Sequence, residues 1–209
     1  MNLAEPYDVA MSRATAAVLR VVIGAEASFS IRQISRIADI AFPQALRIVN
    51  HESARGLILI EQAGRSKMCR FNRDHLAAGA VVELLTLRDR FIQVIKDEIS
   101  TWITKPIHSS LFGSAARGEG GPESDLDVLI IRPDEVPENQ WEEQKYLSGL
   151  RLKSRTGNTV SWFDISITEL KTAYKAAEPI FSEWERDGIS LSESPLSDLL
   201  PRTKSHHRR

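Results

Sequence analysis

Cysteine is nearly absent from this chain, and long apolar runs are missing altogether. Cys69 is the single cysteine in 209 residues, so the chain cannot form a disulfide within itself, and a reducing compartment is expected. No run approaches the ~18 apolar residues of a membrane span, and the start of the chain lacks the basic and apolar segments of a secretory signal. These absences predict a cytoplasmic protein with no membrane partner.

Zinc-site spacing, hydrolase motifs and internal repeats are also missing. The five histidines are scattered, with no Cys or His partner at the spacing of a zinc site, and no Ser-His-Asp order suggests a hydrolase. The net charge is only −1, yet residues 1–80 hold ten Lys or Arg against seven Asp or Glu, whereas residues 105–190 hold ten against fifteen. This asymmetry favours two modules with different partners.

The stretch 111–131, which reads LFGSAARGEGGPESDLDVLII, carries the clearest chemical signal. Apolar residues at both of its ends predict two strands, joined by a small-residue turn and a loop rich in Gly and Glu. Alternation along a strand places Asp125 and Asp127 on one face, about 6–7 Å apart. Carboxylates this close repel each other unless a cation lies between them, and Mg²⁺ with its oxygen ligands is the natural occupant.

Gly113 and Ser114 extend this interpretation. Glycine lets a backbone approach a ligand closely, exposed N–H groups in such a turn bind anions, and Ser114 adds a hydroxyl donor. A phosphate-binding turn beside paired carboxylates is the combination of groups that phosphoryl or nucleotidyl transfer requires. The plainer alternative is two strands joined by a polar loop.

Residues 113–127 contain the pattern GSxxRG followed by SDxD, which resembles the signature of the DNA polymerase β-like nucleotidyltransferase superfamily, especially its minimal prokaryotic members. The resemblance implies an α/β (α+β) core with a mixed sheet over residues 105–191, an NTP substrate, and two Mg²⁺ sites held by three carboxylates. Asp125 and Asp127 match the first two of these. The nucleotide-binding residues that we expect are Gly113, Ser114, Arg117 and Ser124. For Arg117, a structural ion pair is an equal alternative.

Asp164 is the candidate for the third carboxylate, with a catalytic and a metal-binding role. Residues 159–165 predict a strand in which Val160, Trp162 and Asp164 share a face. An acid among these apolar residues requires an explanation, because burying an unpaired carboxylate costs free energy. The family places its third acid on a later strand of the sheet, and Asp164 is the only acid in this one. A strand-end acid in water is the alternative.

Residues 1–80 predict three helices followed by a β-hairpin. A capping box at Ser30 begins the second helix, and a proline fits the first turn of the third. The expected helices are 10–24, 31–38 and 43–55, and the expected strands are 57–62 and 67–72. This order resembles a winged helix-turn-helix of the kind found in small bacterial repressors.

The resemblance implies that the third helix enters the major groove of double-stranded DNA. Phe42, Leu46 and Val49 would face the core. The DNA-binding residues expected are Gln44, Arg47, His51 and Arg55 on the opposite face of the helix, with Arg65 and Lys67 at the wing for phosphate contact. The alternative is a solvated helix face in a module that binds protein.

Residues 81–104 predict one long connector helix, because apolar side chains recur there every three or four residues. This helix either joins two modules rigidly and pairs with its copy in a homodimer, or it packs against both domains. From Ser192 the composition turns to Ser, Pro and basic residues, which predicts a disordered basic tail. The expected segments are therefore 1–80, 81–104, 105–191 and 192–209.

Three functions fit these patterns. The first is a Mg²⁺-dependent nucleotidyltransferase, fused to a DNA-binding winged helix, that transfers NMP from an NTP to an unidentified acceptor hydroxyl with release of pyrophosphate. The second is a transcription regulator whose nucleotidyltransferase domain only senses nucleotide or dimerises. The third is an antitoxin-like partner protein. Turnover of a labelled NTP separates the first from the second.

Overall fold

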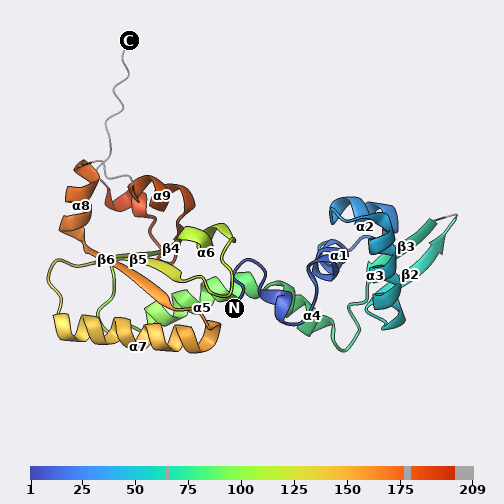
Figure 1. Cartoon of the computed structure of the whole chain (residues 1–209), viewed down its shortest axis with the longest axis horizontal. Coiled ribbons are helices and arrows are strands. Elements are labelled where there is room, and N and C mark those ends of the chain that lie inside the picture. The colour runs from blue at the N-terminus through green and yellow to red at the C-terminus, as the bar shows by residue number, and fades with distance from the viewer. Residues whose placement is uncertain (65, 177–179, 201–209) are drawn as a thin grey trace, which may run out of the picture. The chain divides into compact units, whose positions relative to one another are not determined.

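The computed structural model describes residues 1–64, 66–176 and 180–200, and the chain divides into two compact units (Figure 1). No helix within these ranges is both long and apolar enough to cross a membrane. The units are Glu5–Arg88, called the front unit, and Met1–Ala4 together with the chain from Asp89 onward, called the carboxyl-terminal unit.

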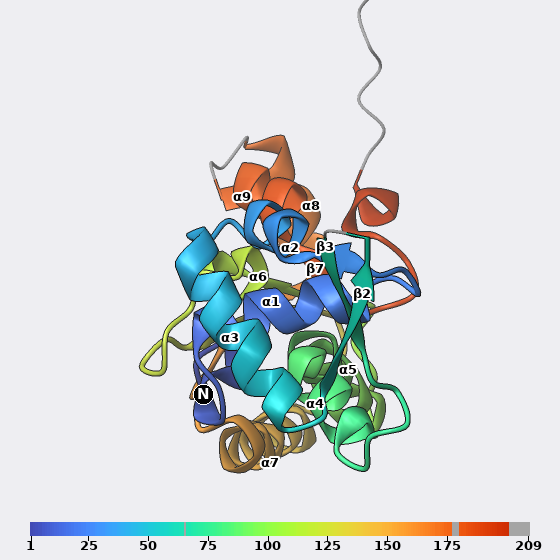
Figure 2. The same cartoon turned by 90° about the vertical axis from the view of Figure 1, so that its right-hand side faces the viewer.

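The front unit consists of helices on a small antiparallel sheet, and Figure 2 looks onto it. Its elements are η1 (Pro6–Val9), α1 (Arg13–Ile23), β1 (Phe29–Ser30), α2 (Ile31–Ile37), α3 (Phe42–Ala54), β2 (Ile58–Ala63), β3 (Ser66–Phe71) and α4 (Ala78–Leu85). Ser30 and Gln33 form the predicted reciprocal capping box at the start of α2. The strand order is β1-β3-β2, so a short strand that we did not predict joins the predicted hairpin.

One side of α3 builds the core of the front unit. Ala45, Ile48 and Val49 are buried there, and the half-buried Leu46 packs against the same cluster. Phe42, which we expected in the core, is 41% exposed instead. It is the first residue of α3 and therefore lies beyond the edge of the core, although it shares the helical spacing of the buried residues.

The carboxyl-terminal unit is built on a four-stranded mixed sheet. Its elements are α5 (Leu87–Ser100), β4 (His108–Phe112), α6 (Gly113–Arg117), β5 (Leu126–Arg132), α7 (Glu138–Thr156), β6 (Val160–Ser166), α8 (Ile167–Lys175), α9 (Ile180–Asp187), β7 (Ile189–Ser190) and η2 (Leu196–Leu199). The strand order is β6-β5-β4-β7, with β5 parallel to β6 and the other pairs antiparallel. Helix α7 provides the crossover that a parallel pair requires. This mixed α+β architecture agrees with the expected fold class.

Different helices cover the two faces of this sheet (Figure 1). Val128 and Ile130 of β5 belong to the core formed with α5 and α7, which we call the α5–α7 face. Leu129 and Ile131 belong to the core formed with α8 and α9, which we call the α8–α9 face. Because side chains alternate along a strand, Asp127 lies on the α8–α9 face.

The single connector helix predicted over 81–104 is wrong. The segment forms two helices. Helix α4 ends at Leu85 and is capped by Thr86, whose hydroxyl donates to the carbonyls of Val82 and Glu83. Helix α4 belongs to the front unit, whereas α5 contributes to the carboxyl-terminal unit from Asp89 onward. The apolar spacing was correct, but it records burial without indicating which of two cores receives each side chain.

The predicted boundary of the first module is also wrong at its start. Leu3 is completely buried in the core of the carboxyl-terminal unit. The backbone N–H of Ala4 donates to the carbonyl of Gly120 at 2.9 Å. The first four residues therefore belong with the later part of the chain and not with the helices that follow them.

The disordered tail predicted from Ser192 begins too early. Leu196–Leu199 form a 3-10 helix, and both Leu196 and Leu200 are buried against α8 and α9. The Ser and Pro content of this stretch suggested disorder, but two leucines supply enough apolar surface to hold it on the core. The remainder of the predicted tail, 201–209, lies outside the described residues.

Candidate active site

Gly113 and Asp127 are packed directly against each other. Gly113 begins α6 immediately after β4, with a φ of 67°, a left-handed conformation that residues with a side chain rarely adopt. Asp127 pairs with Phe112 across the two strands, which brings its carboxylate over the turn. A Cβ atom at Gly113 would collide with Asp127 Oδ2, so only glycine fits beside this acid.

Asp125 and Asp127 lie close enough to interact electrostatically. Asp125 is exposed and Asp127 is half-buried. Burial raises the pKa of Asp127, the negative charge of Asp125 raises it further, and Arg117 opposes both effects. Ser161 pairs with Asp127 on the neighbouring strand, and its hydroxyl is 3.5 Å from Asp125 Oδ2. Two carboxylates that repel each other in this way are suited to binding a hard divalent cation.

Asn158 supports the loop that presents Asp125, a role that we did not predict. It is buried, and its Nδ2 donates to the carbonyls of Pro122 and Ser124 at 3.2 and 2.9 Å. The Ser124 hydroxyl accepts a hydrogen bond from the Gly121 N–H at 2.9 Å, so it closes the loop on itself. In the sequence, Asn158 follows a glycine and is indistinguishable from an ordinary turn residue.

Arg117 is held in ion pairs. Its Nε donates to Glu119 at 2.8 Å and its Nη1 donates to Asp187 at 3.2 Å. Hydrogen bonds to Glu119 and then Asp187 raise the pKa of Arg117, and the guanidinium groups, Arg186 foremost, lower the pKa of Asp187 to about 2. These contacts favour the structural alternative for Arg117, although its positive charge still lowers the pKa of Asp127.

Asp164 lies away from the other two carboxylates. It pairs in register with Ile130, so its side chain is on the α5–α7 face, opposite to that of Asp127. Trp141 Nε1 and Lys145 Nζ, both from α7, donate to its Oδ2 at 2.7 Å. The assignment of Asp164 as third metal ligand and catalytic acid is therefore wrong. Lys145, from the helix that covers this face, pairs with the acid in its apolar surroundings.

Ser161 and Phe163 occupy the positions of β6 beside Asp127 on the α8–α9 face. Ser161 pairs with Asp127, and Phe163 pairs with Leu129 and packs edge-to-face on Phe112, with ring centroids 4.8 Å apart. Neither residue is an acid. Within the part of the chain that the structure describes, no group of three or more His, Cys, Asp or Glu could hold a metal ion. The site thus brings together two of the three expected carboxylates.

The side chains predicted to bind DNA from α3 are exposed, but two of them are engaged. Gln44, Arg47, His51 and Arg55 all lie on the surface. His51 Nδ1 is 2.9 Å from Oε1 of the buried Glu52, and Arg55 Nη1 is 3.6 Å from the same oxygen. Helical spacing placed the four side chains on one face, but it did not indicate that two of them would contact the Glu52 carboxylate.

The predicted wing is the hairpin of β2 and β3. Lys67 is exposed on β3, one residue from the start of the strand. Arg65, the other residue predicted there, lies outside the described residues. The hairpin therefore presents Lys67 as the described cation nearest its tip.

The chain has weak similarity to known structures and a more specific similarity over one segment. No curated protein matches it. A crystal structure of a toxin-antitoxin with AMP-PNP is 17% identical, with 52% of this chain and 77% of that chain covered and a TM-score of 0.36. A MarR family transcriptional regulator from Silicibacter pomeroyi is 20% identical, with 43% and 66% covered and a TM-score of 0.34. Residues 89–158, which include β4, α6, β5 and α7, match the model of the family described as nucleotidyltransferase domain.

Proposed function

We propose that the carboxyl-terminal unit binds an NTP with Mg²⁺ and transfers NMP to an acceptor hydroxyl. The observation that carries this proposal is the contact between Gly113 and Asp127, in which a glycine of positive φ lies directly under a carboxylate. Such a turn lets phosphate oxygens approach backbone N–H groups beside the acid. The match of residues 89–158 to the nucleotidyltransferase domain family supports the same class of reaction.

The residues present fit one Mg²⁺ ion. Asp125 and Asp127 are the hard oxygen donors that Mg²⁺ prefers. Burial and, after it, the charge of Asp125 raise the pKa of Asp127, and a bound cation would offset both effects. Nucleotide sites commonly hold Mg²⁺ with one or two carboxylates and complete its shell with substrate phosphates, so two acids suffice. When bound, the ion would neutralise negative charge on the triphosphate. The second Mg²⁺ site, expected from the family, lacks its third acid, because no described His, Cys, Asp or Glu forms a group of three with Asp125 and Asp127 that could hold a metal ion.

The other residues of the site would position the substrate. Ser114, in the first turn of α6, would donate its hydroxyl to a phosphate oxygen. Asn158 would keep Asp125 in place by holding its loop. Arg117 would contribute positive charge while remaining paired with Glu119. The acceptor hydroxyl would attack the α-phosphorus and release its proton to solvent, the bond from the α-phosphorus to the bridging oxygen would break, and pyrophosphate would leave.

Ser161 and Phe163 favour a second candidate function. They stand on β6 where a third carboxylate beside Asp127 would have to lie, and nucleotide binding requires that third acid less than turnover does. In this candidate the protein is a transcription regulator, and the carboxyl-terminal unit senses nucleotide without transferring it. An antitoxin-like role stays a prediction.

We also propose that the front unit is a winged helix that binds double-stranded DNA. Gln44 and Arg47 are exposed on α3, and Lys67 is exposed on the hairpin, as such binding requires. His51 and Arg55 would contribute less, because Glu52 already pairs with them. A module of the same shape that binds protein is the alternative.

The decisive experiment uses the full-length chain with each α-labelled NTP, Mg²⁺ and cell extract. Transfer of label to an acceptor by the wild type, and its loss in Asp125→Asn, would support the nucleotidyltransferase. Glu123→Gln, which changes an exposed acid of the same loop, is the matched control and should retain transfer.

The regulator predicts a different pattern in the same samples. NTP would bind without transfer of label, and the DNA affinity of the full-length chain would change when NTP and Mg²⁺ are added. That change would disappear in Asp125→Asn. A wild-type chain that binds no nucleotide, with or without Mg²⁺, would contradict both candidates.

A further inference from the structure

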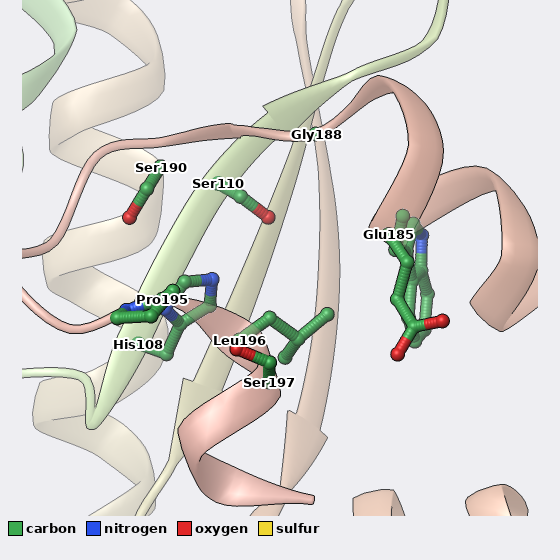
Figure 3. Close-up of a pocket in the computed structure, with 9 residues that line it drawn as sticks. His108, Ser110, Glu185, Gly188, Ser190, Pro195, Leu196 and Ser197 are labelled. Carbon is green, nitrogen blue, oxygen red and sulfur yellow. The ribbon is translucent and has the colours of Figure 1, made fainter.

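A separate pocket of about 240 Å³ opens beside β4, between α9 and the segment that leads into η2 (Figure 3). His108 and Ser110 line it from β4, and they pair with Ile131 and Leu129, so they point to the α8–α9 face. Trp184 lines it from α9. The pocket shares no residue with the proposed nucleotide site, so what it binds does not depend on the function proposed above.

Three residues that line this pocket each have a buried polar atom with no hydrogen-bond partner among the described residues. These atoms are Nε2 of His108, Oγ of Ser110 and Nε1 of Trp184. The three residues are only 1%, 3% and 6% exposed. Folded proteins rarely leave such groups unpaired, and here two elements bring three of them to one cavity. Figure 3 shows the Ser110 hydroxyl directed toward the space between Leu196 and Glu185.

The hydrogen-bonding character of each atom follows from its surroundings. His108 Nδ1 is 3.0 Å from the carbonyl of Ser194, which can only accept, so Nδ1 carries the proton. Burial lowers the pKa of His108, so the ring is neutral and its Nε2 is an acceptor. Trp184 Nε1 can only donate, and the Ser110 hydroxyl can do either. The pocket therefore offers an acceptor, a donor and one adaptable group.

The charge and shape of the lining restrict the ligand further. No Lys or Arg is among the described residues of the lining, whereas Glu185 contributes a carboxylate, so phosphates and other anions are disfavoured. Pro195 and Leu196 supply apolar surface, against which water gains no hydrogen bonds. Three polar atoms need only a few water molecules as hydrogen-bond partners, and the volume of the pocket is larger than those waters would fill. A partly apolar, uncharged molecule with its own donor and acceptor suits this lining.

We propose that this pocket binds a small neutral heterocycle of nucleobase size that carries an N–H donor next to a ring-nitrogen or carbonyl acceptor. The ligand N–H donates to Nε2 of His108, and the ligand acceptor receives the N–H of Trp184. The hydroxyl of Ser110 takes whichever role the ligand leaves open. The ring lies against Leu196.

The experiment titrates the isotope-labelled full-length chain with adenine, cytosine and nicotinamide, and follows the indole N–H signal of Trp184 by NMR. Trp184→Phe assigns that signal. Methyl nicotinate is the control ligand, because it keeps the ring and the carbonyl of nicotinamide but has no N–H. We expect a saturable shift with at least one of the three heterocycles, and binding of methyl nicotinate that is about three- to tenfold weaker or more, because it lacks one hydrogen bond.

Ser110→Ala should weaken the binding by about three- to tenfold, the effect of one hydrogen bond. Ser109→Ala is the matched control on the same strand, since its hydroxyl lies 3.1 Å from that of Ser192 and it does not line the pocket. It should leave the affinity unchanged. Ser110→Cys serves if Ser110→Ala fails to fold.

Several results would overturn the proposal. One is the absence of a saturable shift with all three heterocycles, as expected of a cavity that holds only water. Another is equally tight binding of methyl nicotinate. The assigned contacts would also be wrong if the Ser109 and Ser110 variants lost equal amounts of affinity for the heterocycle. They would be wrong as well if inorganic phosphate displaced the heterocycle.

Discussion

At Gly113 a backbone turn and the Asp127 carboxylate occupy adjoining space. Gly113→Ala should lower the free energy of unfolding by about 1–2 kcal/mol from the left-handed backbone alone. It should also weaken NTP binding by roughly tenfold or more, because Asp127 must move away from the new Cβ. Urea unfolding and nucleotide titration measure the two effects. Gly121→Ala is the control: nothing lies within 4 Å of its Cβ position, and both quantities should stay near the wild-type values.

The raised pKa of Asp127 predicts a pH-dependent stability. Because this pKa lies above the ordinary value of 3.8, the charged carboxylate lowers stability above the folded pKa, and the penalty disappears as pH falls toward 3.8. Without nucleotide or metal, Asp127→Asn should therefore be more stable than the wild type at neutral pH, and its advantage should shrink on acidification. Urea unfolding over a pH series measures this. An advantage that is the same at every pH would contradict the prediction.

The pKa of Asp134 is shifted in the direction opposite to that of Asp127. Its carboxylate accepts hydrogen bonds from the hydroxyl and the backbone N–H of Thr168, at 2.8 and 3.0 Å, and these bonds lower its pKa. Its contribution to stability is therefore present above 3.8 and is lost as pH falls through the lowered pKa. In the same series, Asp134→Asn should be less stable than the wild type at neutral pH.

At the scale of elements, Asp164 joins β6 to α7. Asp164→Asn removes the negative charge that Lys145 and Arg132 face, and we expect the free energy of unfolding to fall by about 1–3 kcal/mol. Mg²⁺-dependent nucleotide binding should remain, since Asp127 lies on the other side of the sheet and Asp125 lies in the loop before β5. Unfolding and nucleotide titration of this variant beside Asp125→Asn provide the test. If the Asp164→Asn chain folds but no longer binds nucleotide, Asp164 would belong to the nucleotide site after all.

Helix α3 allows a graded test of DNA binding. Arg47→Ala should reduce affinity about tenfold and alter sequence preference, as expected of a side chain that reaches base edges. Arg55→Ala should have a smaller effect, because His51 and Glu52 already bind its guanidinium. Gel-shift titration at low salt, with one arginine removed in each variant, compares them. If no DNA of any sequence shifts with the wild type, the front unit is better explained as a protein-binding module.

At the scale of the whole molecule, Leu3 belongs to a different unit from the residues that follow it. Leu3→Ala should destabilise the carboxyl-terminal unit by about 2–4 kcal/mol, as expected for a fully buried leucine. Hydrogen exchange should accelerate in β4, β5 and β6 and remain unchanged in α1 and α3. Faster exchange in the front-unit helices alone would show that the division of the chain is incorrect. Val9→Ala, at a side chain that is 73% exposed, is the control.

The sequence by itself determined features that depend on neighbouring residues. The capping boxes at Ser30 and Ser166 were predictable, because a cap and its partner lie three residues apart on one turn of chain. The approach of Asp125 to Asp127 was predictable as well, because the two acids are only two residues apart along the chain, although Asp125 lies in the loop just before β5 and not on the strand as expected. The turn at Gly113 was recognisable from its small residues, although the clash that excludes any other residue there was not.

The tertiary structure decided which face of the sheet each strand residue meets. Alternation grouped Asp164 with Trp162, but only the register of β6 on β5 and the position of α7 reveal that this face is opposite to Asp127. The pocket at His108 likewise depends on α9 and the segment before η2, which are some eighty residues away along the chain. Such contacts follow from the packing of elements distant in sequence, and local spacing carries no information about which elements will meet.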